Sequence, residues 1–218
     1  MTKKEKAAIV EERLTKIYPD AICSLEYSKP YELLMATRLS AQCTDARVNI
    51  VTRVLFKEYP TLESIAGAKL EDMEAIVKPT GFYHVKAQNL IDMAKMLLFD
   101  YDGVVPDSME ELLKLPGVGR KTANLVLGDI YGQPSYVCDT HCIRITNRLG
   151  LTTTKDPAKT ETELRKILAP ETSGAFCHRM VLFGRDTCTA RSPKCDLCPL
   201  QDLCKEYQTL SKKKTTKK

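Results

Sequence analysis

The feature that most constrains how this chain folds is a group of closely spaced cysteines near its C-terminus, 188-CTARSPKCDLCPLQDLC-204. The spacing is Cys-x6-Cys-x2-Cys-x5-Cys. Exposed unpaired thiols oxidise readily, so four of them in 17 residues indicate a metal site. Structural zinc usually takes two CxxC-type pairs, whereas a [4Fe–4S] cluster also takes four thiolates and tolerates irregular spacing. A single CxxC pair favours iron–sulfur over zinc, and both alternatives stay open on spacing alone.

The other cysteines bear on the redox compartment. The chain has nine Cys in total, and the five outside the cluster lie in periodic apolar segments, at Cys23, Cys43, Cys138, Cys142 and Cys177. An odd, scattered set is not the disulfide framework of a small secreted protein. We expect a reducing compartment in which these five act as small buried apolar side chains.

Composition and charge exclude several classes of protein. No run of about 18 apolar residues is present, and the N-terminus lacks the apolar core of a signal peptide. The net charge is +5, but the last eight residues, SKKKTTKK, hold five Lys and no acid. Without them the 28 basic residues equal the 28 acidic ones, so bulk charge does not indicate a nucleic-acid partner. We expect a cytoplasmic, nucleoid-associated protein in a prokaryote or a nuclear one in a eukaryote, with a disordered tail over 211–218.

Helical periodicity dominates the rest of the chain, and no convincing alternating strand is present. Pro30, Thr44 and the pair Asp156-Pro157 are typical helix starts, and Asp107 with Glu110 resembles a capping box. The pattern predicts an all-α protein of about ten short helices, over residues 3–18, 31–39, 45–58, 68–77, 84–99, 108–114, 120–131, 140–149, 157–168 and 173–184.

The stretch 115-LPGVGRKTANLVL-127 joins two of these helices by a very tight turn. Pro116 ends the first helix, Gly117 and Gly119 permit positive φ, and Arg120 begins the next helix. Backbone N–H groups at the start of a helix can bind one phosphate, although a plain corner between two helices needs glycine as well. The longer string LPGVGRKTA resembles the helix-hairpin-helix motif of DNA-repair glycosylases, which implies that Gly117, Val118, Gly119 and Arg120 contact a DNA backbone phosphate.

Lys121 lies at the mouth of the new helix, and 136-YVCDTH-141 follows about 18 residues later. A cation near a helix N-terminus is destabilised, and a neutral amine can form a Schiff base. The simpler alternatives are a surface lysine or one more phosphate contact. Asp139 could simply cap a helix, with Thr140 as its competitor. GVGRKTA followed by VDTH-like residues resembles endonuclease III, a bifunctional DNA glycosylase/lyase that removes oxidised pyrimidines. The resemblance implies that Lys121 and Asp139 are the catalytic lysine and aspartate, with Cys138 in place of an apolar residue.

The chemistry that the resemblance implies is coherent. The target nucleotide rotates out of the duplex, Lys121 attacks its C1′ atom and the damaged base departs. Asp139 accepts a proton or stabilises the positive charge on the sugar, and β-elimination from the imine then cleaves the strand 3′ to the lesion.

The cysteine spacing also resembles that of endonuclease III and its relatives, where it holds a [4Fe–4S] cluster. The implied ligands are Cys188, Cys195, Cys198 and Cys204, and the cluster would fix a loop in a segment too short to build a core. Arg191 and Lys194, between the first two ligands, would face DNA phosphates, unless they are ordinary solvated charges.

Two further loops could fill the gap that a flipped nucleotide leaves. Gln42 in 39-LSAQCTD-45 matches the glutamine of the family's LSAQ-TD string, and Phe82 in 79-PTGFYHVKA-87 stands where a leucine is expected, with His84 in place of an asparagine. A capping Gln and a core Phe are the alternatives. His141 is a further candidate for a sugar or phosphate contact, unless it caps its helix.

The resemblance covers nearly the whole chain and implies two helical domains. A six-helix barrel with the hairpin (about 108–131) would span 22–133, and residues 1–21 and 134–210 would form the iron–sulfur domain. Double-stranded DNA containing a damaged base or abasic site would bind a monomer in the cleft between them, where Lys121 faces Asp139. The local charge also favours DNA binding there, because residues 114–148 hold five basic side chains and two acidic ones.

Two other functions remain open at this point. A monofunctional glycosylase acting on mismatched adenine or thymine would share the hairpin, but such relatives usually lack the lysine. The adenine-specific branch also has a Glu where this chain has Arg38, and an extra C-terminal domain. A DNA-binding iron–sulfur module without enzymatic activity is the third alternative.

Overall fold

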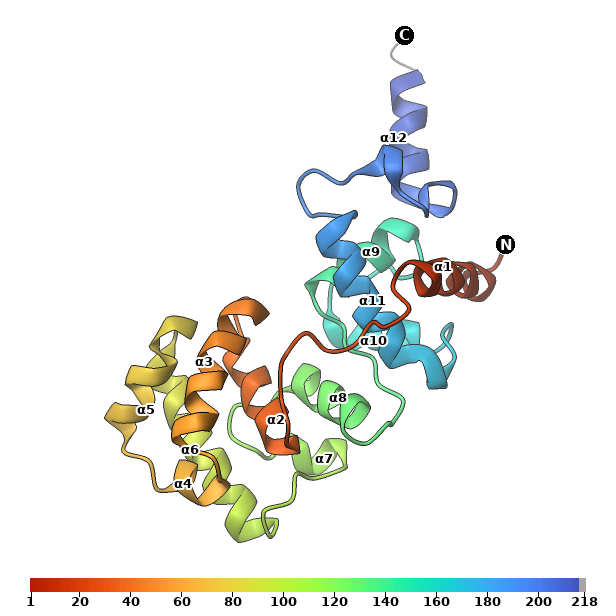
Figure 1. The fold of residues 1–218 in the computed structure, drawn as a ribbon. Helices are drawn as coiled ribbons and strands as arrows, with labels where there is room; N and C mark the ends of the chain where they lie inside the picture. The colour runs from red at the N-terminus through yellow and green to blue at the C-terminus, as the bar shows by residue number, and fades with distance from the viewer. Residues whose placement is uncertain (216–218) are drawn as a thin grey trace. The chain divides into compact units, whose positions relative to one another are not determined.

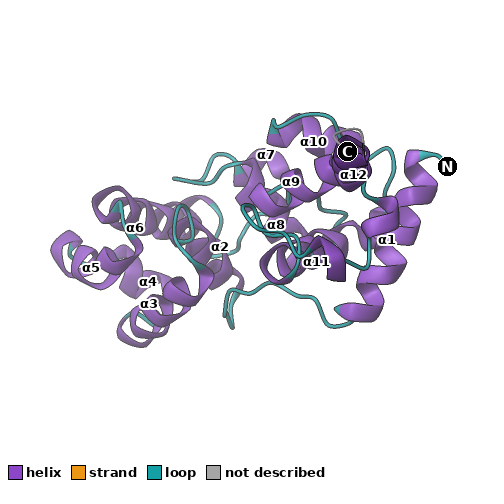
Figure 2. Cartoon of the chain, turned by 90° about the horizontal axis from the view of Figure 1, so that it is seen from above, coloured by secondary structure: helices purple, strands orange, loops and turns teal. Residues whose placement is uncertain are grey.

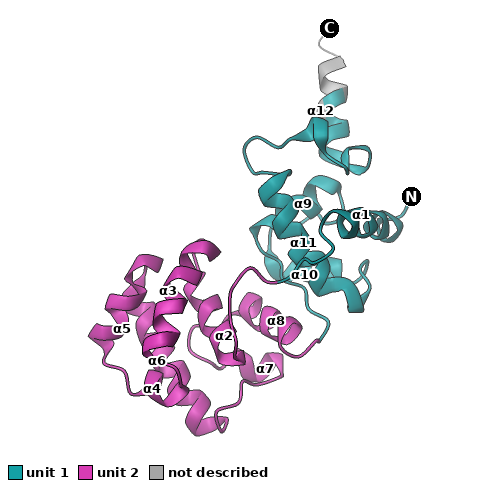
Figure 3. Ribbon diagram, viewed as in Figure 1, with its two compact units in different colours: residues 1–22, 133–218 teal, residues 23–132 magenta. Residues whose placement is uncertain are grey.

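The protein is described by a computed structural model covering residues 1–215 of the 218-residue chain. Those residues form helices and loops, without a strand (Figures 1 and 2). The all-α prediction is therefore confirmed. Contacts between Cα atoms divide the chain into two compact units (Figure 3): unit 1 combines residues 1–22 with the chain from 133 onward, and unit 2 is residues 23–132.

Unit 2 is built around its longest helix, α6, which contacts α2, α4 and α5. Leu33, Leu34, Leu90 and Leu97 are fully buried in its core. The elements of unit 2 are α2 (Pro30–Leu39), α3 (Asp45–Glu58), α4 (Leu62–Ala66), α5 (Leu70–Val77), the 3-10 turn η1 (Lys78–Thr80), α6 (Tyr83–Asp100), α7 (Met109–Leu112) and α8 (Arg120–Asp129).

Unit 1 joins the N-terminal helix to the C-terminal cysteine segment. Lys6, on the first helix, donates hydrogen bonds to the carbonyls of Leu149 and Leu203, and Arg13 pairs with Asp202 at 2.6 Å. The elements of unit 1 are α1 (Lys3–Ile17), α9 (Thr140–Leu149), α10 (Pro157–Leu164), η2 (Pro170–Thr172), α11 (Ser173–Asp186), η3 (Cys195–Leu197), η4 (Gln201–Leu203) and α12 (Lys205–Thr215).

Capping side chains explain where several helices begin. They correct the predicted cap of α7 and show one helix, α4, that was not predicted. Ser108, rather than Asp107, caps α7 by accepting a hydrogen bond from the backbone N–H of Glu111. Thr61 forms a capping box with Ser64 at the start of α4, a helix that the sequence did not predict. Both helices are one turn or little more, so they show no amphipathic period and depend on their caps and on packing.

The C-terminal segment also differs from expectation. Disorder was predicted from residue 211 onward, but α12 continues through Thr215, because lysine-rich sequence is compatible with a helix that has already begun. Residues 216–218 lie outside the described part of the chain. Among the described residues, no helix has the length and apolar character needed to cross a bilayer.

Candidate functional site

The turn between α7 and α8 in unit 2 requires glycine at Gly117. Its φ is +74°, and an added Cβ would lie 2.5 Å from Nε of Arg38 and 2.6 Å from Oδ1 of Asn89. Arg38 donates a hydrogen bond of 2.8 Å to Asn89, so a hydrogen-bonded pair of side chains packs directly against the turn at Gly117. Val118 is buried at 8% exposure and its N–H donates to the carbonyl of Leu115 at 3.1 Å, so this residue anchors the turn.

Gly119 does not adopt the positive φ that the sequence predicted for it. It is the N-cap residue of α8 with φ −108°, so it does not need positive φ, and nothing lies within 4 Å of a Cβ added there. The first N–H groups of a helix have no partner within the helix, and they lie at its positive end. An open surface at such N–H groups suits a phosphate oxygen.

Lys121 follows as the second residue of α8. Residues 122–127 of this helix are buried, whereas the side chains of Arg120 and Lys121 are exposed at its start. The amine that the sequence assigned to catalysis is therefore presented to solvent beside the hairpin turn, where a substrate can reach it.

Asp139 in unit 1 is held by its own helix. It is the N-cap of α9, and its Oδ1 accepts a hydrogen bond of 2.7 Å from the backbone N–H of Cys142. Thr140 is therefore not the cap. The three preceding residues, 136–138, are buried and fix the approach to the helix. The cap orients a half-exposed carboxylate and does not conflict with a catalytic role.

His141 is turned into unit 1, against α11. Its Nδ1 lies 3.1 Å from Nη2 of Arg144, and a Cβ on Gly184 would come within 2.3 Å of the same nitrogen. A guanidinium can only donate, so this contact favours the tautomer in which Nδ1 accepts. Burial lowers the pKa of His141, opposed by Asp139 and assisted by Arg144 and Arg185. The alternative that His141 caps its helix is wrong, since Asp139 does so.

Lys114, Arg144 and Arg148, which belong to the five basic side chains of residues 114–148, are engaged inside their own unit. Lys114 pairs with Glu111 at 2.6 Å, Arg144 donates to the carbonyl of Cys188, and Arg148 pairs with Glu206 at 3.3 Å. The charge count therefore overstated the positive surface available to DNA, because sequence does not show which cations have partners.

The two candidate wedge residues lie at loop tips of unit 2. Gln42 has φ 56° and Phe82 has φ 49°, the left-handed region that residues other than glycine seldom adopt. Phe82 immediately precedes α6 and is 66% exposed, so the alternative that it is a core residue is wrong. Sequence reasoning missed Lys86, which is 1% exposed on the first turn of α6, because a lysine in an amphipathic pattern is normally assigned to the surface.

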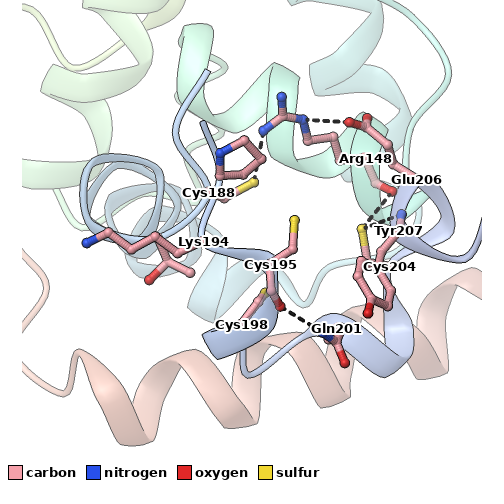
Figure 4. A pocket seen from close by; sticks show the side chains of 11 residues that line it. Arg148, Cys188, Lys194, Cys195, Cys198, Gln201, Cys204, Glu206 and Tyr207 are labelled. Atoms are coloured by element: carbon pink, nitrogen blue, oxygen red, sulfur yellow. Dashed lines mark hydrogen bonds and ion pairs between the residues drawn. The ribbon is translucent and has the colours of Figure 1, made fainter. Parts of the chain in front are cut away.

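The four clustered cysteines surround a single cavity in unit 1 (Figure 4). Its volume is about 50 Å³, several times the roughly 10–15 Å³ needed by one water molecule. A polynuclear cluster is the group that fits four sulfurs placed around such a space.

Hydrogen bonds to two of the sulfurs support this assignment. Nη1 of Arg148 donates to Sγ of Cys188 at 3.3 Å, and the backbone N–H of Tyr207 approaches Sγ of Cys204 at 3.5 Å (Figure 4). Donors around the sulfurs stabilise thiolates and tune an iron–sulfur cluster. Burial raises the pKa of the Cys195 and Cys198 thiols, so bound iron would have to supply the positive charge that ionises them.

Arg191 and Lys194 lie in the loop between the first two cysteines, and both are exposed. The amine of Lys194 extends away from the cysteines (Figure 4). Both cations can therefore meet an external anion without disturbing the cavity.

Comparison with known proteins agrees with this geometry. Residues 35–170 match the family model of the HhH-GPD superfamily base excision DNA repair proteins, and residues 188–204 match the iron–sulfur binding domain of endonuclease III. Endonuclease III of Bacillus subtilis is 42% identical over 208 residues, covering 95% of each chain.

Two solved structures are similar over nearly the whole chain. A non-covalent endonuclease III–DNA complex has a TM-score of 0.92, and a trapped endonuclease III–DNA covalent intermediate has 0.91. Each is 42% identical, covering 97% of this chain and 100% of the other. The iron–sulfur alternative is thereby confirmed over zinc, and the cofactor is a [4Fe–4S] cluster. The chain belongs to the endonuclease III family of HhH-GPD base excision DNA repair proteins.

Proposed function

We propose that this DNA glycosylase/AP lyase excises oxidised pyrimidines through a Schiff base on Lys121, and that it acts as a monomer on duplex DNA. One observation carries the assignment: Lys121 is exposed at the start of α8, beside a turn that only glycine can form, in a chain that is 42% identical to an endonuclease III captured as a covalent DNA intermediate. A covalent intermediate requires a nucleophile, and an accessible amine provides one.

The reaction can be written with these residues. The Lys121 amine attacks C1′ of a flipped nucleotide, the bond from C1′ to the damaged base breaks, and the base leaves with the bonding pair. Asp139 takes the proton that the amine releases and stabilises the charge that develops on the sugar. The C1′–O4′ bond then breaks with a proton passing to O4′, which gives an imine. A C2′ proton passes to water, the C3′–O bond breaks with the phosphate as leaving group, and water hydrolyses the imine and releases the Lys121 amine.

The remaining candidates serve DNA binding. The amides of Gly117 and Gly119 with Arg120 would bind one phosphate at the start of α8, and Arg191 and Lys194 would bind others. Val118, whose N–H donates to the carbonyl of Leu115 at 3.1 Å, would hold the turn in shape for that contact. Gln42 and Phe82 would enter the base stack, where their exposed side chains fill the gap left by the flipped nucleotide. His141 would act indirectly, because its Nδ1 is already used inside unit 1.

The four cysteines Cys188, Cys195, Cys198 and Cys204 would hold the [4Fe–4S] cluster. The bound cluster supplies covalent cross-links to a segment that has few buried side chains of its own: over residues 188–204, Leu200 and Leu203 are the buried ones. The loop that carries Arg191 and Lys194 would thereby be fixed in place.

A panel of duplexes with different lesions tests the proposal. Oxidised pyrimidines should yield a shortened strand without added alkali, and duplexes with an adenine mismatch, a thymine mismatch or no damage should stay intact. Base removal without strand cleavage would instead support a monofunctional glycosylase. Binding without any product would support a DNA-binding module.

A further inference from the structure

A buried lysine in unit 2 joins the starts of both loops that carry the candidate wedges. Lys86 is 1% exposed, and its Nζ donates one hydrogen bond of 2.8 Å to the carbonyl of Leu39 and another of 2.8 Å to the carbonyl of Thr80. Leu39 is the last residue of α2, and Thr80 is the last residue of η1. One amine therefore satisfies carbonyls from segments that are 41 positions apart in the sequence.

The two loop tips follow directly from these carbonyls. Gln42 comes three residues after Leu39, and Phe82 comes two residues after Thr80. Both tip residues have positive φ without being glycine, a conformation that persists where the surrounding structure fixes it. Lys86 is positioned to supply that constraint for both at once.

Burying an ammonium group is costly, so this side chain needs a specific explanation. Burial lowers the pKa of Lys86, and the nearby guanidinium of Arg38 acts in the same direction, opposed by Cys43. Carbonyls at a helix C-terminus carry partial negative charge and lack partners within the helix. A methionine would fill the same space without the desolvation cost, but it would leave both carbonyls unpaired.

We propose that Lys86 is a positioning residue that holds the tips carrying Gln42 and Phe82 at a fixed separation, so that both enter the gap left by one flipped nucleotide. The inference rests on the proposed function of these two residues as wedges. Preorganisation reduces the entropy that each loop loses when it inserts. Lys86 itself contacts neither DNA nor the reacting atoms.

The test compares two substrates for Lys86→Met. Base excision from a lesion duplex requires unstacking of a base, whereas cleavage of an abasic duplex has no base to unstack. The single-turnover rate on the lesion duplex should fall roughly 10- to 100-fold, the range expected when hydrogen bonds to a charged group are lost. The rate on abasic DNA should fall much less. Lys95→Met, an exposed lysine on the same helix, is the matched control and should retain both rates.

A second comparison separates positioning from a general loss of structure. The double variant Gln42→Ala/Phe82→Ala already lacks both wedge side chains. Adding Lys86→Met to it should therefore lower the single-turnover rate on the lesion duplex little further. Equal losses in both backgrounds, or equal losses on both substrates, would overturn the inference. If the unaltered protein fails on the lesion duplex, the proposed function itself is wrong.

If Lys86→Met does not fold, Lys86→Gln replaces it, because the amide keeps two N–H donors without the charge. Hydrogen exchange on the unaltered protein provides an independent measurement. Amides of residues 40–43 and 81–83 should become exchangeable together as temperature rises, since one amine holds both segments. Independent opening of the two segments would contradict the inference.

Discussion

The carboxylate of Asp139 accepts a hydrogen bond of 2.7 Å from the backbone N–H of Cys142, which makes the proposed catalytic acid–base group also the N-cap of α9. Asparagine caps a helix about as well as aspartate. Asp139→Asn should therefore keep the fold and the affinity for duplex DNA while the excision rate falls about 10²- to 10⁴-fold, as for loss of a general acid or base. Thermal unfolding and single-turnover kinetics on one preparation measure both.

Asp139→Ala separates the two roles further, because it removes the cap as well as the charge. It should lower the free energy of unfolding by about 1 kcal/mol relative to Asp139→Asn and share its catalytic defect. If Asp139→Asn turned over at the unaltered rate, Asp139 would be a cap and nothing more.

The two glycines of the hairpin should respond differently to alanine. Gly117→Ala places a Cβ at positive φ and 2.5 Å from Nε of Arg38, so it should destabilise the protein by more than about 1 kcal/mol. Gly119→Ala has ordinary φ and open space, so it should fold normally and weaken DNA binding by obstructing the phosphate. Urea unfolding and a fluorescence binding titration distinguish the two. Unchanged affinity in a folded Gly119→Ala protein would contradict the phosphate site.

Loss of one proposed cluster ligand should be visible directly. Cys198→Ala should abolish the broad absorbance in the visible blue and make the segment 188–204 sensitive to protease, because few buried side chains hold it otherwise. Cys23→Ala, which changes a cysteine of the other unit, should retain the absorbance. Undiminished absorbance in purified Cys198→Ala would show that Cys198 is not a ligand.

The half-buried imidazole of His141 predicts a pH dependence. Its pKa is lowered below 6.5 in the folded protein, so the unfolded chain binds a proton that the folded chain does not. The stabilising contribution is therefore complete above about pH 6.5 and is lost as the pH falls through the lower, folded-state value. Urea unfolding at a series of pH values should show a steeper acid loss for the unaltered protein than for His141→Gln. An NMR titration of His141 with a midpoint above 6.5 would contradict this sign.

Much of the architecture was predictable because it depends on local signals. Helices with an amphipathic period and a side-chain cap, such as the one that Thr44 begins, were predicted within a residue or two. The single-turn helix α4 was missed because its length leaves no period to detect, and Ser108 was passed over for its neighbour Asp107, since both residue types favour the N-cap.

The candidate site was predictable where sequence neighbours make it and unpredictable where distant segments do. The hairpin, Lys121 and the cysteine spacing are contiguous strings. The engagement of Arg144 and Arg148 with partners at least 40 residues away, and the burial of Lys86 between Leu39 and Thr80, depend on packing between segments, which residue type alone does not reveal.

Borohydride trapping tests the central claim most directly, because it reduces a lysine–sugar imine to a stable amine. Damaged duplex DNA should become covalently attached to the unaltered protein and to Lys95→Gln, which alters another exposed lysine of unit 2. Lys121→Gln should bind the same duplex and give no attachment, and peptide mapping of the unaltered adduct should place the sugar on Lys121. Attachment that persists in Lys121→Gln, or maps to another residue, would contradict the account.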